Sequence, residues 1–191
     1  MDLRHAIVKD DLETVDRYFL KFGARNPLVV WNPGYGQLED DRLQRLASYW
    51  REKAEGQNAA PLASIDPTDM RFALGYLMLL DVIDGGFDFR YRLYGTQISE
   101  RFGKDVTGTT LRKFGDKEYI VSFFLGAYQA VMERRQPLLT IHYPKNTSET
   151  ESWTRLILPL ENDSNEITRL LVGQIPGQWR PRPPGMESPA P

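Results

Sequence analysis

Residues 77–108 read LMLLDVIDGGFDFRYRLYGTQISERFGKDVTG, and this stretch decides the fold. An apolar run over 76–83 has the length of a strand. Asp84-Gly85-Gly86 follows as a tight turn, because glycine accepts positive φ angles without steric cost. Residues 87–94 alternate between apolar and polar side chains, which predicts a second strand, and residues 96–102 predict a short helix. The stretch therefore predicts a β-hairpin followed by a helix.

The alternation in the second strand assigns its side chains to two faces of the sheet. The set that we expect on the core side consists of Phe87, Phe89, Tyr91 and Leu93, and the opposite set consists of Asp88, Arg90, Arg92 and Tyr94. The hairpin therefore presents one strongly apolar face, which requires a covering layer.

The rest of the chain adds two long helices and three strands. Apolar residues at helical spacing predict a helix over 38–55 and another over 116–135. Strands are predicted at 138–143, 153–161 and 167–175, each bounded by turn residues. Two groups of strands joined by short turns, with helices between them, predict an α+β fold. We expect a five-stranded antiparallel sheet with helices on one face.

Changes in composition divide the chain into three parts. Residues 1–37 form an N-terminal arm with a helical extension and a Pro/Gly-rich passage. Residues 38–176 form the domain with its leading helix. Residues 177–191 are rich in proline and predict a disordered tail. The sequence leaves two roles possible for the leading helix over 38–55: it can cover the second face of the sheet, or it can pair with another subunit.

Composition excludes several classes of protein. The net charge is −2 over 191 residues without a basic stripe, which argues against a nucleic-acid binder. The chain has no cysteine, which excludes disulfides, a thiolate nucleophile and a Cys-based metal site. We find no signal peptide, and no window approaches the roughly 18 apolar residues of a membrane span. We therefore expect a cytoplasmic protein without a membrane span.

Five short motifs occur in order along the chain. They are Tyr49-Trp50-Arg51, Ile65-Asp66-Pro67, Tyr91-Arg92-Leu93-Tyr94-Gly95-Thr96, Phe102-Gly103-Lys104-Asp105-Val106-Thr107-Gly108 and the strand from Arg155 to Leu160. Together with the order of elements, they resemble the single-domain PAS family of bacteria, which is often found in alphaproteobacteria. The resemblance covers residues 40–176. One departure is the connector at 61–64, which lacks the basic residue expected there.

The resemblance implies a PAS fold and a sensory module in signal transduction that has no output domain of its own. Covalent flavin photochemistry in such a module requires a cysteine, and this chain has none. The long helix carries no histidine that would ligate haem. His142 follows on a strand without a second metal ligand nearby, which favours a buried strand residue over a ligand. We therefore assign no cofactor and no metal.

A long connection between the two strand groups leaves a volume between helices and sheet, which predicts a pocket for a small ligand. The candidate pocket residues are Tyr91, Arg92, Tyr119, Phe123, Tyr128, His142, Arg155 and Gln174. Arg92 and Arg155 can anchor a carboxylate or phosphate, or instead form structural ion pairs or face solvent. The aromatic residues can be plain core or the wall of the pocket.

Catalysis finds no support in the sequence. Only two histidines are present and no Gly-x-Ser-x-Gly elbow accompanies them, so we assign no catalytic residues and expect no enzyme activity. The preferred hypothesis is a PAS-type sensory or interaction module that binds a small molecule of unknown identity, forms a homodimer through residues 1–55 and acts on a protein partner in trans. The alternative is a structural adaptor or dimerisation module of the same fold with a filled core and no ligand.

Overall fold

The computed structural model describes residues 2–115, 119–145 and 149–180. The predicted first turn of the long helix at 116–118 and residues 181–191 of the predicted tail lie outside the described residues.

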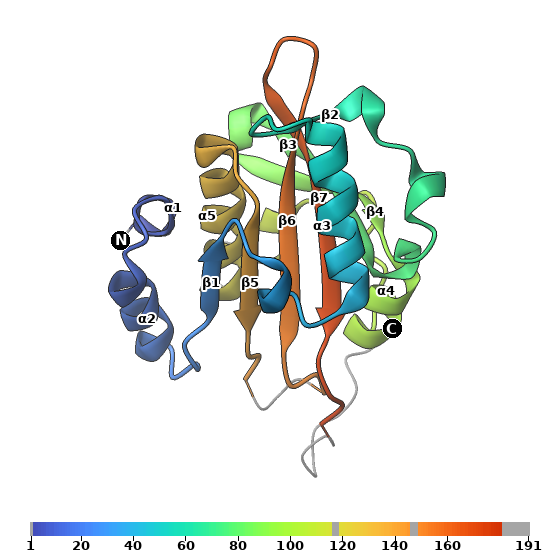
Figure 1. Cartoon of the computed structure of the whole chain (residues 1–191). Coiled ribbons are helices and arrows are strands. Elements are labelled where there is room, and N and C mark those ends of the chain that lie inside the picture. The colour runs from blue at the N-terminus through green and yellow to red at the C-terminus, as the bar shows by residue number, and fades with distance from the viewer. Residues whose placement is uncertain (1, 116–118, 146–148, 181–191) are drawn as a thin grey trace.

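One mixed sheet forms the centre of the molecule (Figure 1). Its strands are β1 Leu28–Trp31, β2 Ala60–Pro61, β3 Leu77–Ile83, β4 Asp88–Tyr94, β5 Leu138–His142, β6 Trp153–Glu161 and β7 Ile167–Pro176. They follow the order β1-β5-β6-β7-β3-β4, with β2 pairing with β6 off this path. All pairings are antiparallel except the short one between β2 and β6. The helices are α1 Leu3–Val8, α2 Leu12–Lys21, α3 Asp41–Ala54, α4 Thr96–Phe102 and α5 Tyr119–Arg134.

The predicted α+β architecture with an antiparallel PAS-like sheet is confirmed, and the five predicted strands are β3 to β7. The number five is too small, because two further short strands join the sheet. β1 pairs with β5, and the two-residue β2 pairs with β6. Both strands are too short to show a periodic pattern, and their pairing with distant strands specifies them.

Helices cover both faces of the sheet, so the prediction of one covered face is incomplete. α3 lies in front of β6 and β7 in Figure 1. The predicted leading helix therefore covers the second face of the sheet, which is one of the two roles that the sequence left open for it. Asp40 caps this helix by accepting a hydrogen bond from the Arg42 amide at 2.9 Å. Trp50 Nε1 donates to the Pro159 carbonyl at 2.9 Å, which ties the helix to β6. A Cβ on Gly173 would lie 2.6 Å from Leu43 Cδ2, so glycine permits this close approach.

The N-terminal arm packs against α5 on the opposite face. The Phe19 ring of α2 meets the Phe123 ring edge-on, with centroids 4.9 Å apart. Trp31 Nε1 on β1 donates to the Ile7 carbonyl of α1 at 3.0 Å. A Cβ on Gly126 of α5 would lie 3.0 Å from the Arg4 amide nitrogen, so a small residue is required where α1 and α5 approach each other. Leu3, Ile7, Val15 and Phe19 of the arm are therefore buried within its own chain, whereas Leu12 and Leu20 stay exposed.

A β-bulge in the first hairpin changes the faces assigned to β4. Tyr91 pairs with Leu80, but Leu93 pairs with Leu79 and Tyr94 with Met78, which leaves Arg92 as the extra residue. The strict alternation predicted for 87–94 is therefore wrong beyond Tyr91: Tyr94, and not Leu93, shares its face.

The beginning of the predicted apolar face also differs. Phe87 is 60% exposed and lies beneath the Arg112 guanidinium, which stands 4.2 Å from the ring centroid. Within the described parts of the chain, no helix has both the length and the apolar character needed to cross a membrane.

Candidate functional site: a cavity between the sheet and α5

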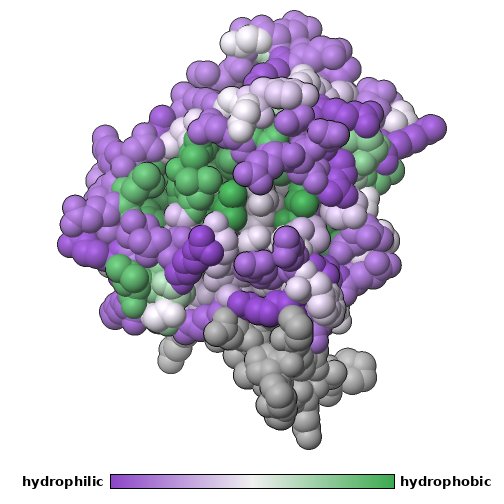
Figure 2. Space-filling model, turned by 60° about the horizontal axis from the view of Figure 1, so that its bottom comes forward, coloured by the Kyte–Doolittle hydropathy of each residue, from purple (hydrophilic) through white to green (hydrophobic). Residues whose placement is uncertain are grey.

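A cavity of about 600 Å³ lies at the end of the sheet where β5 and β7 finish and β6 begins. Besides the strands, α4, the 3₁₀ turn at Leu111–Phe114 and the first turns of α5 contribute to its wall. This end is turned forward in Figure 2, which shows apolar side chains gathered within a surround of hydrophilic ones. The lining residues are Tyr91, Tyr94, Glu100, Arg101, Phe102, Gly103, Val106, Leu111, Phe114, Tyr119, Ile120, Val121, Phe124, His142, Pro144, Glu149, Trp153, Arg155 and Gln174.

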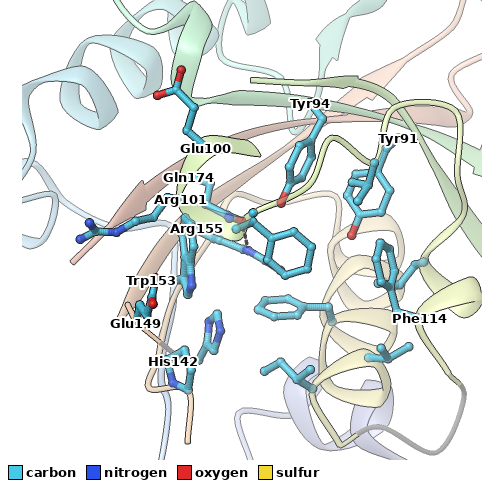
Figure 3. A pocket seen from close by; sticks show the side chains of 18 of the residues that line it. Tyr91, Tyr94, Glu100, Arg101, Phe114, His142, Glu149, Trp153, Arg155 and Gln174 are labelled. Atoms are coloured by element: carbon cyan, nitrogen blue, oxygen red, sulfur yellow. Dashed lines mark hydrogen bonds between the residues drawn. The ribbon is translucent and has the colours of Figure 1, made fainter. Parts of the chain in front are cut away.

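The register of three adjacent strands brings the polar lining residues together. Arg155 of β6 lies opposite Gln174 of β7, and His142 of β5 lies opposite Trp153 of β6. Side chains two apart along a strand share a face, so Trp153 and Arg155 both point toward α5. A cation, an amide, an imidazole and an indole therefore share one wall of the cavity (Figure 3).

Arg155 is the central charged group of this wall. Its Nε donates to Gln174 Oε1, and its Nη1 lies 3.4 Å from the Tyr128 hydroxyl. The guanidinium carbon stands 3.4 Å from the centroid of the Phe124 ring, a cation–π arrangement. Among the described residues, no carboxylate forms an ion pair with Arg155. The positive charge of Arg155 is therefore not paired with a carboxylate of the described chain.

His142 is buried beside this cation. Its side chain is 5% exposed, and its Nδ1 has no hydrogen-bond partner among the described residues. Burial, and next the positive charge of Arg155, hold the pKa of His142 well below its usual value of 6.5. The imidazole is therefore neutral near pH 7 and contributes one unfilled hydrogen-bonding position.

Two tyrosines of β4 form the opposite part of the cavity. Tyr91 and Tyr94 project toward it from neighbouring positions, and their ring centroids are 5.5 Å apart (Figure 3). Burial raises the pKa of both hydroxyls above the usual range, so both remain protonated. Neutral phenols can donate and accept hydrogen bonds.

Other charged residues lie at the edge of the cavity. Arg101 Nη2 donates to the Gly177 carbonyl at 2.6 Å, and its guanidinium carbon lies 4.4 Å from the centroid of the Trp179 ring. The Glu100 and Arg101 side chains extend away from Arg155 in Figure 3. Arg101 therefore holds the segment after β7 against α4.

Comparison with known proteins identifies the family. The family model described as PAS domain matches residues 39–175, which is most of the chain. The chain belongs to the PAS domain family. The match confirms the resemblance to PAS proteins at the level of the domain family.

Other comparisons add less. No curated protein matches the chain. The solved structure of an RNA-binding light-oxygen-voltage receptor is similar with a TM-score of 0.45 and 13% sequence identity. The match covers 78% of this chain and 38% of that receptor chain.

In this PAS domain, five of the eight residues predicted from the sequence line the cavity: Tyr91, Tyr119, His142, Arg155 and Gln174. Arg92 does not line it, because it directly follows Tyr91 on the strand and points to the other side of the sheet, where its Nε donates to Asp81 at 2.8 Å. Phe123 and Tyr128 also do not line it. Both are fully buried in the core, although the Tyr128 hydroxyl supports Arg155 from behind.

Several lining residues of the PAS domain escaped the sequence analysis. Tyr94 was hidden by the bulge, which the alternating pattern cannot reveal. Trp153 carried a usable signal, because it alternates with Arg155 on a predicted strand. Phe124 and Phe114 carried none, since aromatic residues beside a cavity look the same as core residues.

The lining groups of the PAS domain are suited to binding. Arg155 offers charged donors, Gln174 and the tyrosines offer neutral polar groups, and aromatic rings offer apolar contact. Within residues 2–115, 119–145 and 149–180, no cluster of three or more His, Asp or Glu side chains is placed to hold a metal ion.

Proposed function

We propose that this PAS domain is a sensory module that binds a small molecule in the cavity between the sheet and α5. The observation that carries the proposal is the cavity of about 600 Å³, whose volume falls within the range of small-molecule sites. A mostly apolar wall with a few convergent polar groups is typical of such sites. In this proposal the module binds without turnover and passes its state to a protein partner in trans.

The alternative of an adaptor with a filled core has less support. The adaptor hypothesis supplies no group to bind His142 Nδ1, which belongs to the cavity wall and has no hydrogen-bond partner among the described residues. A bound ligand would supply that partner, so the sensory proposal accounts for the wall and the adaptor hypothesis does not.

Native mass spectrometry tests ligand binding directly. The full chain is incubated with a metabolite extract, separated from unbound compounds by gel filtration and weighed beside a Val121→Phe variant. Val121 lines the cavity from α5, so the larger side chain fills the site. We expect the wild type and an Arg92→Met control to retain an added mass and Val121→Phe to lose it. A wild type without added mass, or an equal mass on Val121→Phe, would overturn the proposal.

We also propose that the module forms a homodimer in the cytoplasm. Support comes from the N-terminal arm, where Leu20 is 62% exposed and Tyr35 is 63% exposed although the arm is otherwise packed on α5. Light scattering of the full chain tests the assembly, and Leu20→Glu should shift a dimer toward the monomer mass. A wild type that is monomeric at high concentration would contradict it, and cell fractionation tests the location.

The narrower assignment to the bacterial single-domain branch is a further part of the proposal. Two of its motifs meet in the structure, since the Asp66 amide donates to the Tyr49 hydroxyl at 2.8 Å. The motif residues Phe102 and Arg155 both line the cavity. Bacterial homologues that keep these residues together would support the assignment, and their independent loss would count against it.

A further inference from the structure

The charge inside the cavity limits what it can bind. Arg155 has five N–H donors, and the structure shows partners only for its Nε and one Nη1 hydrogen. Its Nη2 makes no hydrogen bond within the described chain. The Arg155 side chain is half-buried in the cavity wall, so a ligand that brings a negative charge gains charge-assisted hydrogen bonds from these unused donors.

The guanidinium is also held in position. Gln174 fixes its Nε, Tyr128 contacts Nη1, and Phe124 lies against its flat face at 3.4 Å. These three contacts come from β7 and α5, two elements of the rigid core. The remaining edge of the guanidinium is therefore pre-oriented, which suits the planar, two-oxygen geometry of a carboxylate.

A second, independent group next to Arg155 also lacks a partner. His142 Nδ1 is buried without a hydrogen bond among the described residues. The strand register places His142 opposite Trp153, so it is a diagonal neighbour of Arg155 across β5 and β6. One anionic group lying between these side chains would satisfy both.

The other lining residues argue against a doubly charged ligand. Arg101 lies at the edge of the cavity, where its Nη2 donates to the Gly177 carbonyl and its guanidinium stacks on Trp179, and its side chain extends away from Arg155 (Figure 3). Glu100 and Glu149 also line the cavity, so its described lining carries as many carboxylates as guanidinium groups and has no surplus of positive charge for a phosphate dianion. Arg155 is the guanidinium that shares the polar wall with His142 and Gln174, and one such cation matches one negative charge, which favours a carboxylate over a phosphate.

The remaining wall is rich in aromatic rings. The Phe114 ring lies 6.1 Å from the Tyr91 ring in an edge-on arrangement, and Phe124, Tyr94 and Trp153 complete the wall. Flat rings among such side chains gain offset-stacked or edge-on contacts beyond the burial of apolar surface. The ligand body that fits best is therefore itself aromatic.

We propose that the cavity of this PAS domain selects small aromatic monocarboxylates, with the carboxylate held by Arg155 and His142 and the ring held by Tyr91, Phe114 and Phe124. This assignment rests on the proposed function, because it names the ligand class of the same site.

Isothermal titration calorimetry with three matched probes tests the assignment. The probes are 1-naphthoate, 1-naphthamide and 1-naphthyl phosphate, which share one ring system and differ in charge. We expect 1-naphthoate to bind at least about tenfold more tightly than 1-naphthamide, since a charge-assisted hydrogen bond contributes about that much, and more tightly than 1-naphthyl phosphate, whose second negative charge has no matching cation on the described polar wall.

Variants assign the selectivity to Arg155. Arg155→Met should weaken 1-naphthoate at least about tenfold and leave 1-naphthamide unchanged. Arg155→Lys keeps the charge without the planar fork, so it should fall between the wild type and Arg155→Met. Arg92→Met is the matched control, because Arg92 is also a strand arginine but pairs with Asp81 outside the cavity. Circular dichroism confirms that each variant is folded.

Each result decides between the claims. Equal affinity for 1-naphthamide, or unchanged 1-naphthoate affinity in Arg155→Met, would overturn the anionic ligand while leaving the proposed ligand-binding function in place. Tighter binding of 1-naphthyl phosphate would replace the carboxylate with a phosphate. Absence of binding by all three probes would overturn the aromatic monocarboxylate assignment, and the retained mass from the metabolite extract then decides the proposed function separately.

Discussion

The face of the sheet under α3 and the face under α5 are built from the same strands and differ in what fills them. On the α3 side, aliphatic residues such as Leu156, Leu158 and Leu171 pack against Leu43 and Leu46 of the helix. On the α5 side, the alternate positions of the same strands carry Thr140, His142, Arg155 and Gln174 at one end. The first face is filled by apolar side chains, and the second contains the cavity.

This difference separates stability from binding within one sheet. The period of two along β5, β6 and β7 lets each strand supply apolar side chains to α3 and polar ones to the cavity. Gly173 contributes to the first face by admitting α3 closely, and its neighbour Gln174 contributes to the second by orienting Arg155. Substitutions on the two faces should therefore have separable effects.

The largest expected effect is the loss of packing on the α3 side. Leu46 is fully buried there, so Leu46→Ala should lower the free energy of unfolding by about 2–5 kcal/mol. Urea denaturation followed by circular dichroism measures this loss. The affinity for a cavity ligand should stay the same, and a loss below about 1 kcal/mol would mean that this face is not tightly packed.

Adding volume to each face gives a sharper contrast. Ala47 on α3 is 2% exposed in a filled layer, so Ala47→Leu should cost about 1–3 kcal/mol of the free energy of unfolding. Val121→Phe adds more volume but projects into the cavity, so it should cost less than about 1 kcal/mol while ligand binding is lost. Chemical denaturation of both variants measures the difference. Equal losses would contradict an open cavity.

The polar end of the α5 side predicts a dependence of stability on pH. The folded chain holds the pKa of His142 well below 6.5, so the unfolded chain binds more protons as pH falls below that value. Stability is fully present above about pH 6.5 and declines by up to about 1.4 kcal/mol per pH unit below it.

Unfolding free energies measured between about pH 6.5 and 5.5 test this dependence before carboxylates titrate. His142→Phe keeps a ring beside Phe124 and should remove the slope. The same slope in the variant would show that another group is responsible.

The smallest effect is expected from Arg92, which lies outside both the filled layer under α3 and the cavity on the α5 side. Its side chain is 51% exposed, and Asp81 keeps a second partner in Arg169, whose Nε lies 2.9 Å away. Arg92→Met should therefore change the free energy of unfolding by about 0–1 kcal/mol. Thermal and urea unfolding measure it, and a loss well above 1 kcal/mol would give this arginine a structural role that its exposure does not indicate.

Local pattern was sufficient to predict most of the fold. The strands β3 to β7 and the helices α3 to α5 lie within a few residues of their predicted bounds, because each is long enough to show its period. β1 and β2 could not be predicted from four and two residues, since their pairing partners lie far along the chain. The role of α3 as second cover also depended on tertiary packing.

The candidate site was predictable where alternation holds and not where it breaks. Arg155 and Gln174 occupy regular strand positions, and both line the cavity as expected from their places. Leu93 and Tyr94 follow the bulge at Arg92, so their faces are exchanged relative to the pattern. For Phe123 and Phe124, adjacent residues of one helix, only the packing of α2 on Phe123 decides which one reaches the cavity.

Methyl NMR of the full chain with 1-naphthoate tests the central contrast most directly. The methyl groups of Val106, Leu111 and Val121 line the cavity, whereas those of Leu43 and Leu46 lie in the filled layer under α3. We predict that titration shifts the first group and leaves the second unchanged, and that Arg155→Met suppresses the shifts. Shifts of equal size on both faces, or no shift of any cavity methyl, would contradict a binding site confined to the α5 side.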